Sequence, residues 1–307
     1  MFLKLDNAEI GYQKSLLSKA NAELYLGEVA LLIGDNGVGK TTLLKSILGQ
    51  LPLLDGKIII DGKSSKELSS SEIASKIAVV YSKATLPANY TVYDLVSLGK
   101  FIHYPFYFNL NKEDKISVEQ VIENLGLSIY KHKKLTELSD GNLQKAFIGR
   151  ALAQNSPFIL LDEPTTHLDE KNKIQILQIL RELAVNSNKL ILFSSHDWRL
   201  AKEFSDKIWY LSNGELKSGI TEEILLENKE LINPELFTFS NHFRPPTISA
   251  PKNEAEMMYS FLQKNINFDL SEVSVLYKDT IWHISKDNFQ HSATNFEELL
   301  KILQNIH

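Results

Sequence analysis

Residues 34–49, GDNGVGKTTLLKSILG, decide the fold. They follow the apolar run EVALLIG (28–34), which is typical of a strand buried on both faces. After the glycines the hydrophobic period becomes helical. The octet from Gly34 to Thr41 fits the pattern G-x-x-x-x-G-K-[ST] in full. A buried strand, a glycine-rich turn and a helix in that order predict a phosphate-binding loop, and a chance turn would lack this context.

Each position of this loop has a chemical reason. Glycines let backbone N–H groups approach phosphate oxygens closely. Lys40 neutralises charge on the β- and γ-phosphates, and the Thr41 hydroxyl is a ligand for Mg²⁺. The sequence therefore predicts a site for ATP and Mg²⁺, and its residues in this segment are Gly34, Asn36, Gly37, Gly39, Lys40, Thr41 and Thr42.

Two further buried strands end in side chains that carry chemistry. FILLDE (158–163) ends at Asp162 and Glu163, and LILFSSH (190–196) ends at His196. Taken alone, the two acidic residues would be interpreted as part of a solvated turn, and the histidine would be interpreted as a structural residue. Beside a phosphate-binding loop at the same sheet edge, Asp162 is expected to hold Mg²⁺ and Glu163 to polarise the attacking water. His196 is expected to hydrogen-bond the γ-phosphate.

A polar segment, ELSDGN (137–142), opens an amphipathic helix. Ser139 is a good N-cap residue, with Asn142 near the third helical position. A cap alone would account for the segment. A helix start also carries unpaired N–H groups and partial positive charge, which suit an anion.

The order of these motifs resembles the ATP-binding subunit of an ABC transporter, over roughly residues 2–240. The resemblance implies an α/β P-loop NTPase fold of the ABC type, with a mixed sheet core, an antiparallel β subdomain and a helical subdomain. It also implies a head-to-tail homodimer. Ser139 and Gly141 of one subunit would then face the γ-phosphate held by the other, although LSDGN departs from the family's LSGGQ at Asp140 and Asn142.

Other roles carry over from the resemblance one residue at a time. Glu163 matches the catalytic glutamate, His196 the switch histidine and Asp169 the D-loop aspartate at the dimer interface. Tyr12 matches the aromatic residue that stacks on adenine, and the alternative is an ordinary strand-end tyrosine. Ser82 occupies the slot where the family has a metal-contacting glutamine, so its contact with Mg²⁺ is expected to pass through water.

Within the family, TVYDLVSLGK (91–100) is most like importers of iron–siderophore, haem or vitamin B12 type. An aromatic group follows where such subunits receive the permease, and a local hydrophobic core is the alternative. Its members are Phe101, Tyr104, Phe106, Tyr107 and Phe108. The implied partners are the membrane subunits of an ABC permease, a second copy of the chain and, indirectly, a substrate-binding protein.

The composition and charge of the chain argue against several kinds of partner and site. The chain has 307 residues, a net charge of −5 and a pI near 5.9, which argues against nucleic acid as a partner. It has no cysteine, which excludes disulfides and thiolate metal sites. No apolar stretch approaches the ~18 residues that cross a bilayer. Together with the resemblance, this implies a cytoplasmic protein that is peripheral on the inner face of the plasma membrane through the permease.

Near residue 240 the hydrophobic periodicity is lost, and the segment SNHFRPPTISAPKN (240–253) contains three prolines. We expect an ATP-binding domain over 1–240, a proline-containing linker over 241–252 and a small α/β appendage over 253–307. The appendage should hold a helix (253–264), two short strands around Lys278 and Asp279 and a closing helix (295–305).

Two other functional classes compete with a transport ATPase: a soluble ABC-type ATPase and a non-hydrolysing regulatory module. Glu163 and His196 argue against the second of these.

Overall fold

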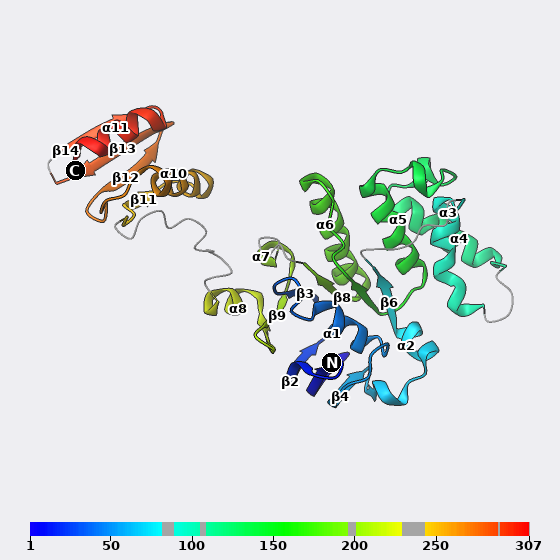
Figure 1. Ribbon diagram of the computed structural model, residues 1–307. Coiled ribbons are helices and arrows are strands. Elements are labelled where there is room, and N and C mark those ends of the chain that lie inside the picture. The colour runs from blue at the N-terminus through cyan, green and yellow to red at the C-terminus, as the bar shows by residue number, and fades with distance from the viewer. Residues whose placement is uncertain (82–88, 105–108, 196–200, 229–242, 288, 307) are drawn as a thin grey trace. The chain divides into compact units, whose positions relative to one another are not determined.

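The computed structural model describes all residues except 82–88, 105–108, 196–200, 229–242, 288 and 307. The chain divides into two compact units, Met1–Ile232 and Asn233–His307, which Figure 1 draws with their elements labelled. The first unit holds the phosphate-binding loop. In the described residues, every helix is too short or too polar to span a bilayer.

The strands of the first unit are β1 (Leu3–Gly11), β2 (Ser15–Leu24), β3 (Val29–Ile33), β4 (Asp55–Ile60), β5 (Lys63–Ser64), β6 (Ile77–Val80), β7 (Phe158–Leu161), β8 (Leu190–Ser194), β9 (Lys207–Ser212) and β10 (Glu215–Ile220). Its helices are α1 (Lys40–Ile47), α2 (Ser70–Lys76), α3 (Val92–Ser97), α4 (Lys112–Asn124), α5 (Asp140–Ala153), α6 (Glu170–Ser187), α7 (Ala201–Phe204) and α8 (Thr221–Glu227). Short 3₁₀ turns are η1 (Ser65–Glu67), η2 (Leu98–His103), η3 (Ser128–Tyr130) and η4 (Leu135–Glu137).

A mixed sheet forms the centre of this unit. Among the described residues its order is β10-β9-β3-β8-β7-β6, with β10 antiparallel to β9 and the other neighbours parallel. The carboxyl ends of β3, β7 and β8 therefore meet at one edge, as the apolar runs predicted. The hairpin between β9 and β10 turns at Asn213 and Gly214, both with positive φ, as expected for a two-residue turn.

The two faces of the mixed sheet pack against different layers, because successive side chains of a strand alternate. In β3, Leu31 and Ile33 face a core shared with α3, α5 and α6. Ala30 and Leu32 face a second core shared with α1 and the antiparallel sheet β2-β1-β4-β5. Figure 1 shows α6 and α1 on opposite sides of the strands. The predicted fold class, with mixed core, antiparallel β and helical parts, is confirmed.

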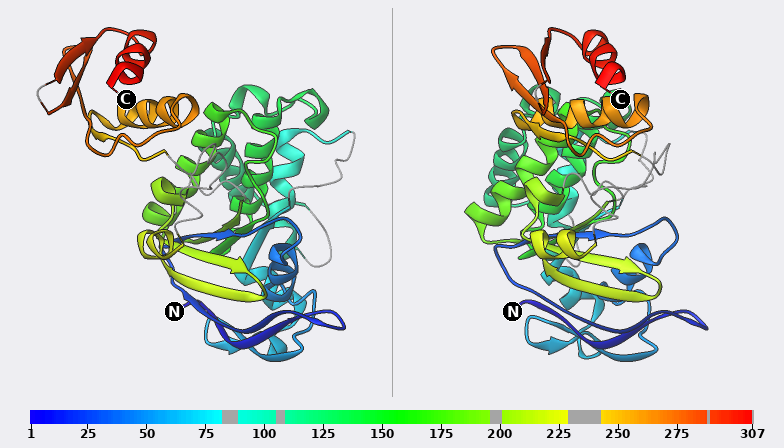
Figure 2. Two further views of the ribbon diagram at one scale, coloured as in Figure 1. Left: turned by 60° about the vertical axis from the view of Figure 1, so that its left-hand side comes forward. Right: turned by 90° about the vertical axis from the view of Figure 1, so that its left-hand side faces the viewer.

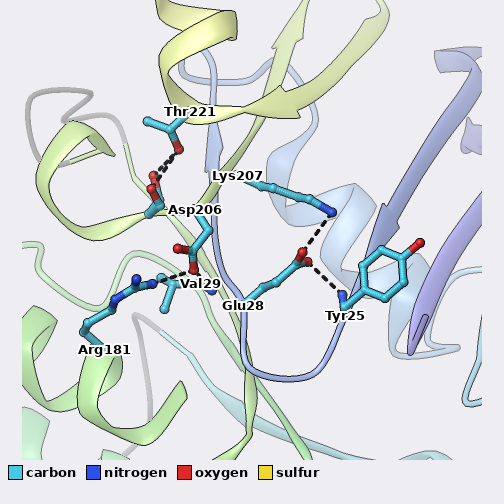
Figure 3. Close-up of polar contacts among 8 residues, drawn as sticks. Tyr25, Glu28, Val29, Arg181, Asp206, Lys207 and Thr221 are labelled. Atoms are coloured by element: carbon cyan, nitrogen blue, oxygen red, sulfur yellow. Dashed lines mark hydrogen bonds and ion pairs between the residues drawn. The ribbon is translucent and has the colours of Figure 1, made fainter. Parts of the chain in front are cut away.

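Polar contacts fix the start of β3 to its neighbours. The Asp206 carboxylate accepts bonds from the Val29 N–H (2.8 Å) and from the Arg181 guanidinium (2.5 Å) of α6. Lys207 forms an ion pair with Glu28 at 3.0 Å. Figure 3 shows these groups gathered around the turn into β3. The strand that carries the phosphate-binding loop is therefore anchored at its far end by α6 and β9.

The second unit is a four-stranded sheet covered by two helices. Its elements are β11 (Thr247–Ser249), α10 (Lys252–Asn265), β12 (Ser274–Lys278), β13 (Ile281–Lys286), β14 (Phe289–Ala293) and α11 (Phe296–Ile306). The described strand order is β11-β12-β13-β14, with β11 parallel to β12 and the rest antiparallel. Met258 and Leu262 of α10 share a core with Leu299 and Leu303 of α11. Both helices therefore lie on one face of the sheet, and Figure 2 gives two further views of them.

The structure differs from the sequence-based expectation in this unit in two ways. Residues 247–249, which were expected to lie in a linker, form the edge strand β11. A further strand, β14, pairs with β13, so the sheet has four described strands where two were expected. The reason is that β11 pairs with a strand more than twenty residues away, which local proline content does not reveal.

Candidate functional site

The phosphate-binding loop connects the end of β3 to the start of α1. Gly34 has φ 154°, and a Cβ atom there would lie 2.5 Å from the Leu211 carbonyl oxygen. Only glycine fits where the loop passes β9 so closely. Gly39, with φ 115°, occupies the N-cap position of α1, and no side chain caps the helix. The first N–H groups of α1 are thus arranged to bind an anion.

Lys40 is the first residue of α1, and its side chain is buried. Its Nζ donates to the Gly34 carbonyl oxygen (2.8 Å) and to that of Asp35 (3.0 Å). These bonds hold the ammonium beneath the loop that would wrap a phosphate chain. The other predicted members of the loop, Asn36 and Gly37, are exposed at its crest. Thr42 is half-buried in the first turn of α1.

Thr41 and Asp162 come together although they are 121 residues apart in sequence. The Thr41 Oγ1 donates to the Asp162 Oδ2 at 3.3 Å. A hydroxyl and a carboxylate at this spacing fit one Mg²⁺ ion, which prefers oxygen ligands and keeps several waters. The described residues contain no cluster of three or more histidine, aspartate or glutamate side chains that would form an all-protein cage. The donors present therefore fit a Mg²⁺ that phosphates and water help to hold.

Ser194 organises both acidic residues. Its side chain is fully buried, and its Oγ donates to the Asp162 Oδ1 (2.7 Å) while accepting from the Glu163 N–H (2.8 Å). Glu163 has a left-handed φ of 50°, and its carboxylate accepts from Thr166 Oγ1 at 3.2 Å. Neither Ser194 nor Thr166 was predicted from the sequence. A polar residue within the apolar run of β8 is the signal that could have identified Ser194.

The helix after LSDGN begins as expected. Ser139 is the N-cap of α5, and its side chain accepts from the Asn142 N–H at 3.5 Å. Gly141 is buried, and a Cβ atom there would lie 2.5 Å from Asn172 Oδ1. Asn172 belongs to the first turn of α6 and is held by Asp169, which accepts from its backbone N–H (2.8 Å) and its side-chain Nδ2 (3.1 Å). The close packing of α5 against α6 therefore requires glycine at this position, a contact that was not predicted from the sequence.

Helix α5, called the signature helix below because it begins within LSDGN, is also hydrogen-bonded to strand β6 and to the end of α2. The Arg150 guanidinium donates to the Val79 carbonyl oxygen at 2.7 Å, and Gln154 Nε2 donates to the carbonyl oxygens of Ala74 and Ile77 (2.7 and 3.1 Å). Burial lowers the pKa of Arg150 from its ordinary value, but a guanidinium stays charged at neutral pH. The helix is thus joined to the strand whose chain leads on to residue 82.

Of the remaining predicted residues, three lie in the described part of the chain and five lie outside it. Tyr12 lies between β1 and β2 with 59% of its surface exposed, so its ring is accessible. Phe101 is exposed, and Tyr104 donates from its hydroxyl to Asp114 Oδ2 (2.5 Å). The predicted residues that lie outside the described part of the chain are Ser82, Phe106, Tyr107, Phe108 and His196.

Comparison with known proteins places this geometry in a family. Residues 17–166 match the model described as "ABC transporter". The iron(3+)-hydroxamate import ATP-binding protein of Bacillus subtilis is 32% identical over 264 residues, which are 83% of this chain and 98% of that protein.

Two solved structures agree with this match. One, of a transporter described as of the metal-chelate type in an inward-facing conformation, is 29% identical with a TM-score of 0.67, covering 75% of this chain and 88% of that one. A dimeric ATP-binding cassette in a post-hydrolysis state with ADP and phosphate is 28% identical with a TM-score of 0.63, covering 71% and 98%. The chain therefore belongs to the ATP-binding proteins of the ABC transporter family and is an ATP hydrolase.

Proposed function

We propose that this chain is the ATPase subunit of an ABC importer for an iron complex, with a siderophore or haem as the carried group, or for cobalamin. The observation that carries the ATPase part of the proposal is the set Thr41, Asp162, Ser194 and Glu163, assembled beside the uncapped start of α1. The similarity to a hydroxamate import protein along nearly its whole length supports the substrate class.

The hydrolytic step follows from the positions of these groups. The first N–H groups of α1 and the Lys40 ammonium would hold the β- and γ-phosphates of ATP. Thr41 and Asp162 would hold Mg²⁺, which neutralises charge on the phosphate oxygens. The Glu163 carboxylate would take a proton from a water molecule as the water oxygen attacks the γ-phosphorus. The bond from that phosphorus to the bridging oxygen breaks, and ADP leaves.

We further propose that two copies act head to tail, each completing the other's ATP site with Ser139, Gly141 and Asp169. Ser139 and Asp169 are exposed and lie at helix starts. The dimeric cassette with ADP and phosphate supports this arrangement. In the same proposal, Tyr12 stacks on adenine, Ser82 contacts the metal through water and His196 contacts the γ-phosphate.

The permease subunits would bind the helical part of the first unit. A pocket of about 500 Å³ lies there between α3, η2 and the start of α4. Its lining includes Tyr90, Tyr93, Leu98, Leu110 and Lys115. Aromatic and apolar groups with a few polar neighbours suit a helix laid into a groove. The chain would then be cytoplasmic and peripheral on the membrane, and a substrate-binding protein would act through the permease.

The proposal is tested by uptake of a labelled ferric hydroxamate in native cells that lack the chain. Cells complemented with the wild-type chain should recover uptake, and cells complemented with Lys40→Ala should not. Uptake of labelled haem and cobalamin in the same strains identifies the carried compound. If uptake of all three compounds is the same with and without the chain, the soluble ATPase is the better assignment.

A further inference from the structure

Helix α10 of the second unit has two opposite faces. Its inner face carries Met258 and Leu262, which are fully buried against the sheet. On its outer face a groove of about 490 Å³ runs along the helix toward the start of α11. Its lining is Asn253, Glu256, Met257, Ser260, Phe261, Lys264 and Phe296. The α10 members except Phe261 follow helical spacing and form one stripe almost opposite the core.

Met257 makes the stripe unlike an ordinary solvated helix face. The residue is 63% exposed, and the Phe261 and Phe296 rings beside it pack with centroids 4.8 Å apart. An exposed thioether next to two aromatic rings is adaptable apolar surface of the kind that binding sites use. The charged residues of the stripe indicate which partner surface would match it.

The charges of the stripe are arranged symmetrically around Ser260. Glu256 lies four residues before it and Lys264 four residues after it, each about 6 Å along the helix axis. If a second α10 packs antiparallel with Ser260 at the crossing point, each Glu256 faces the other copy's Lys264. A two-fold axis produces this pairing twice, because an isologous interface repeats every contact. The small Ser260 side chain allows the two helices to approach closely.

We propose that the outer face of α10 is a homodimer interface, on which the same face of a second copy packs antiparallel. The inference builds on the proposed function, because a head-to-tail ATPase dimer would keep two copies of this unit at high effective concentration. The α10 pair would then hold the two subunits together while the ATP sites open. Its charge pattern is self-complementary, which is why a second copy fits better than an acidic or a basic partner.

The absence of cysteine in the native sequence makes a direct test available. Ser260→Cys places one thiol on the proposed axis, and a bismaleimide with a reach of about 8–10 Å spans two packed helices there. Ser274→Cys is the matched control, because Ser274 is exposed on β12 and its neighbour Val275 faces the core. In the full chain without nucleotide, Ser260→Cys should give about tenfold more cross-linked dimer than the control.

Charge reversal tests the register of the two helices. In the Ser260→Cys background, Glu256→Lys or Lys264→Glu replaces two attractive pairs by two repulsive ones, and each should lower the cross-linking yield about tenfold. The double variant restores opposite charges and should recover the yield. Recovery would not occur if either change simply unfolded the unit.

The outcomes separate this inference from the proposed function. Equal cross-linking of the Ser260→Cys and Ser274→Cys chains, with ATP hydrolysis intact, would overturn the α10 interface and leave the ATPase assignment in place. Failure of the double charge reversal to rescue would overturn the antiparallel register. Adding Lys40→Ala to the Ser260→Cys chain should leave the nucleotide-free cross-link unchanged, because without nucleotide the α10 contact alone holds the two copies together. Loss of the cross-link in that variant would overturn the inference.

Discussion

The two groups of residues assigned to ATP are built in different ways. Thr41, Asp162 and Ser194 bond to one another across β7, β8 and α1, with Asp162 and Ser194 buried. Ser139 and Asp169 are exposed, and their side chains cap the helices that they precede. The first group is assembled within one chain. The second presents two helix starts to solvent, which suits a half-site that a second copy would use in the proposed dimer.

The largest effect is expected from Glu163→Gln. Hydrolysis should fall about a thousandfold, because the amide cannot take a proton from water, while ATP affinity stays near that of the wild type. Lys40→Ala is the contrasting variant and should lose ATP affinity as well. Steady-state turnover and binding of a fluorescent ATP analogue measure the two properties. If Glu163→Gln hydrolyses ATP at the normal rate, another group activates the water.

Gly141→Ala tests how far the second group depends on the packing of α5 against α6. The new Cβ atom would meet Asn172 Oδ1 at 2.5 Å, so we expect a loss of about 1–3 kcal/mol in stability. Turnover should fall about a hundredfold through misplacement of the helix start.

Adding Asn172→Ala to Gly141→Ala removes the steric clash. Thermal unfolding should then recover toward that of the Asn172→Ala single variant, and turnover should recover with it, because the loss is attributed to displacement of the helix start by this clash. Turnover that stays low after stability has recovered would show that Gly141 does more than pack against Asn172.

The smallest effect is expected from Ser194→Ala. The substitution removes the hydrogen bonds that hold the Asp162 carboxylate and the Glu163 backbone N–H. Turnover should fall about tenfold, which corresponds to the free energy of about one such hydrogen bond. The Mg²⁺ concentration for half-maximal activity should rise, which a purely structural change would not produce. Ser97→Ala is the matched control, since its buried Oγ has no hydrogen-bond partner among the described residues. Equal kinetics of the two variants would remove Ser194 from the site.

The sequence predicted the first group better than the second, for a physical reason. The strand and helix periods and the G-x-x-x-x-G-K-[ST] pattern are local, so β3, α1 and β7 follow from short stretches. The contact of Gly141 with Asn172 depends on how α5 packs against α6, and that packing is not local. The bond of Ser194 to Asp162 depends on the register of β7 beside β8, with Leu161 opposite Phe193. Strand β11 was missed because its partner β12 is distant in sequence.

The central claim is that one complete ATP site needs two chains, and mixing two inactive variants tests it most directly. Lys40→Ala and Gly141→Ala chains with different affinity tags are co-expressed, and the heterodimer is purified through both tags. One of its two sites then combines an intact phosphate-binding loop with an intact signature helix, so turnover should recover to about half of the wild-type value. A heterodimer no more active than either variant alone would contradict the shared site.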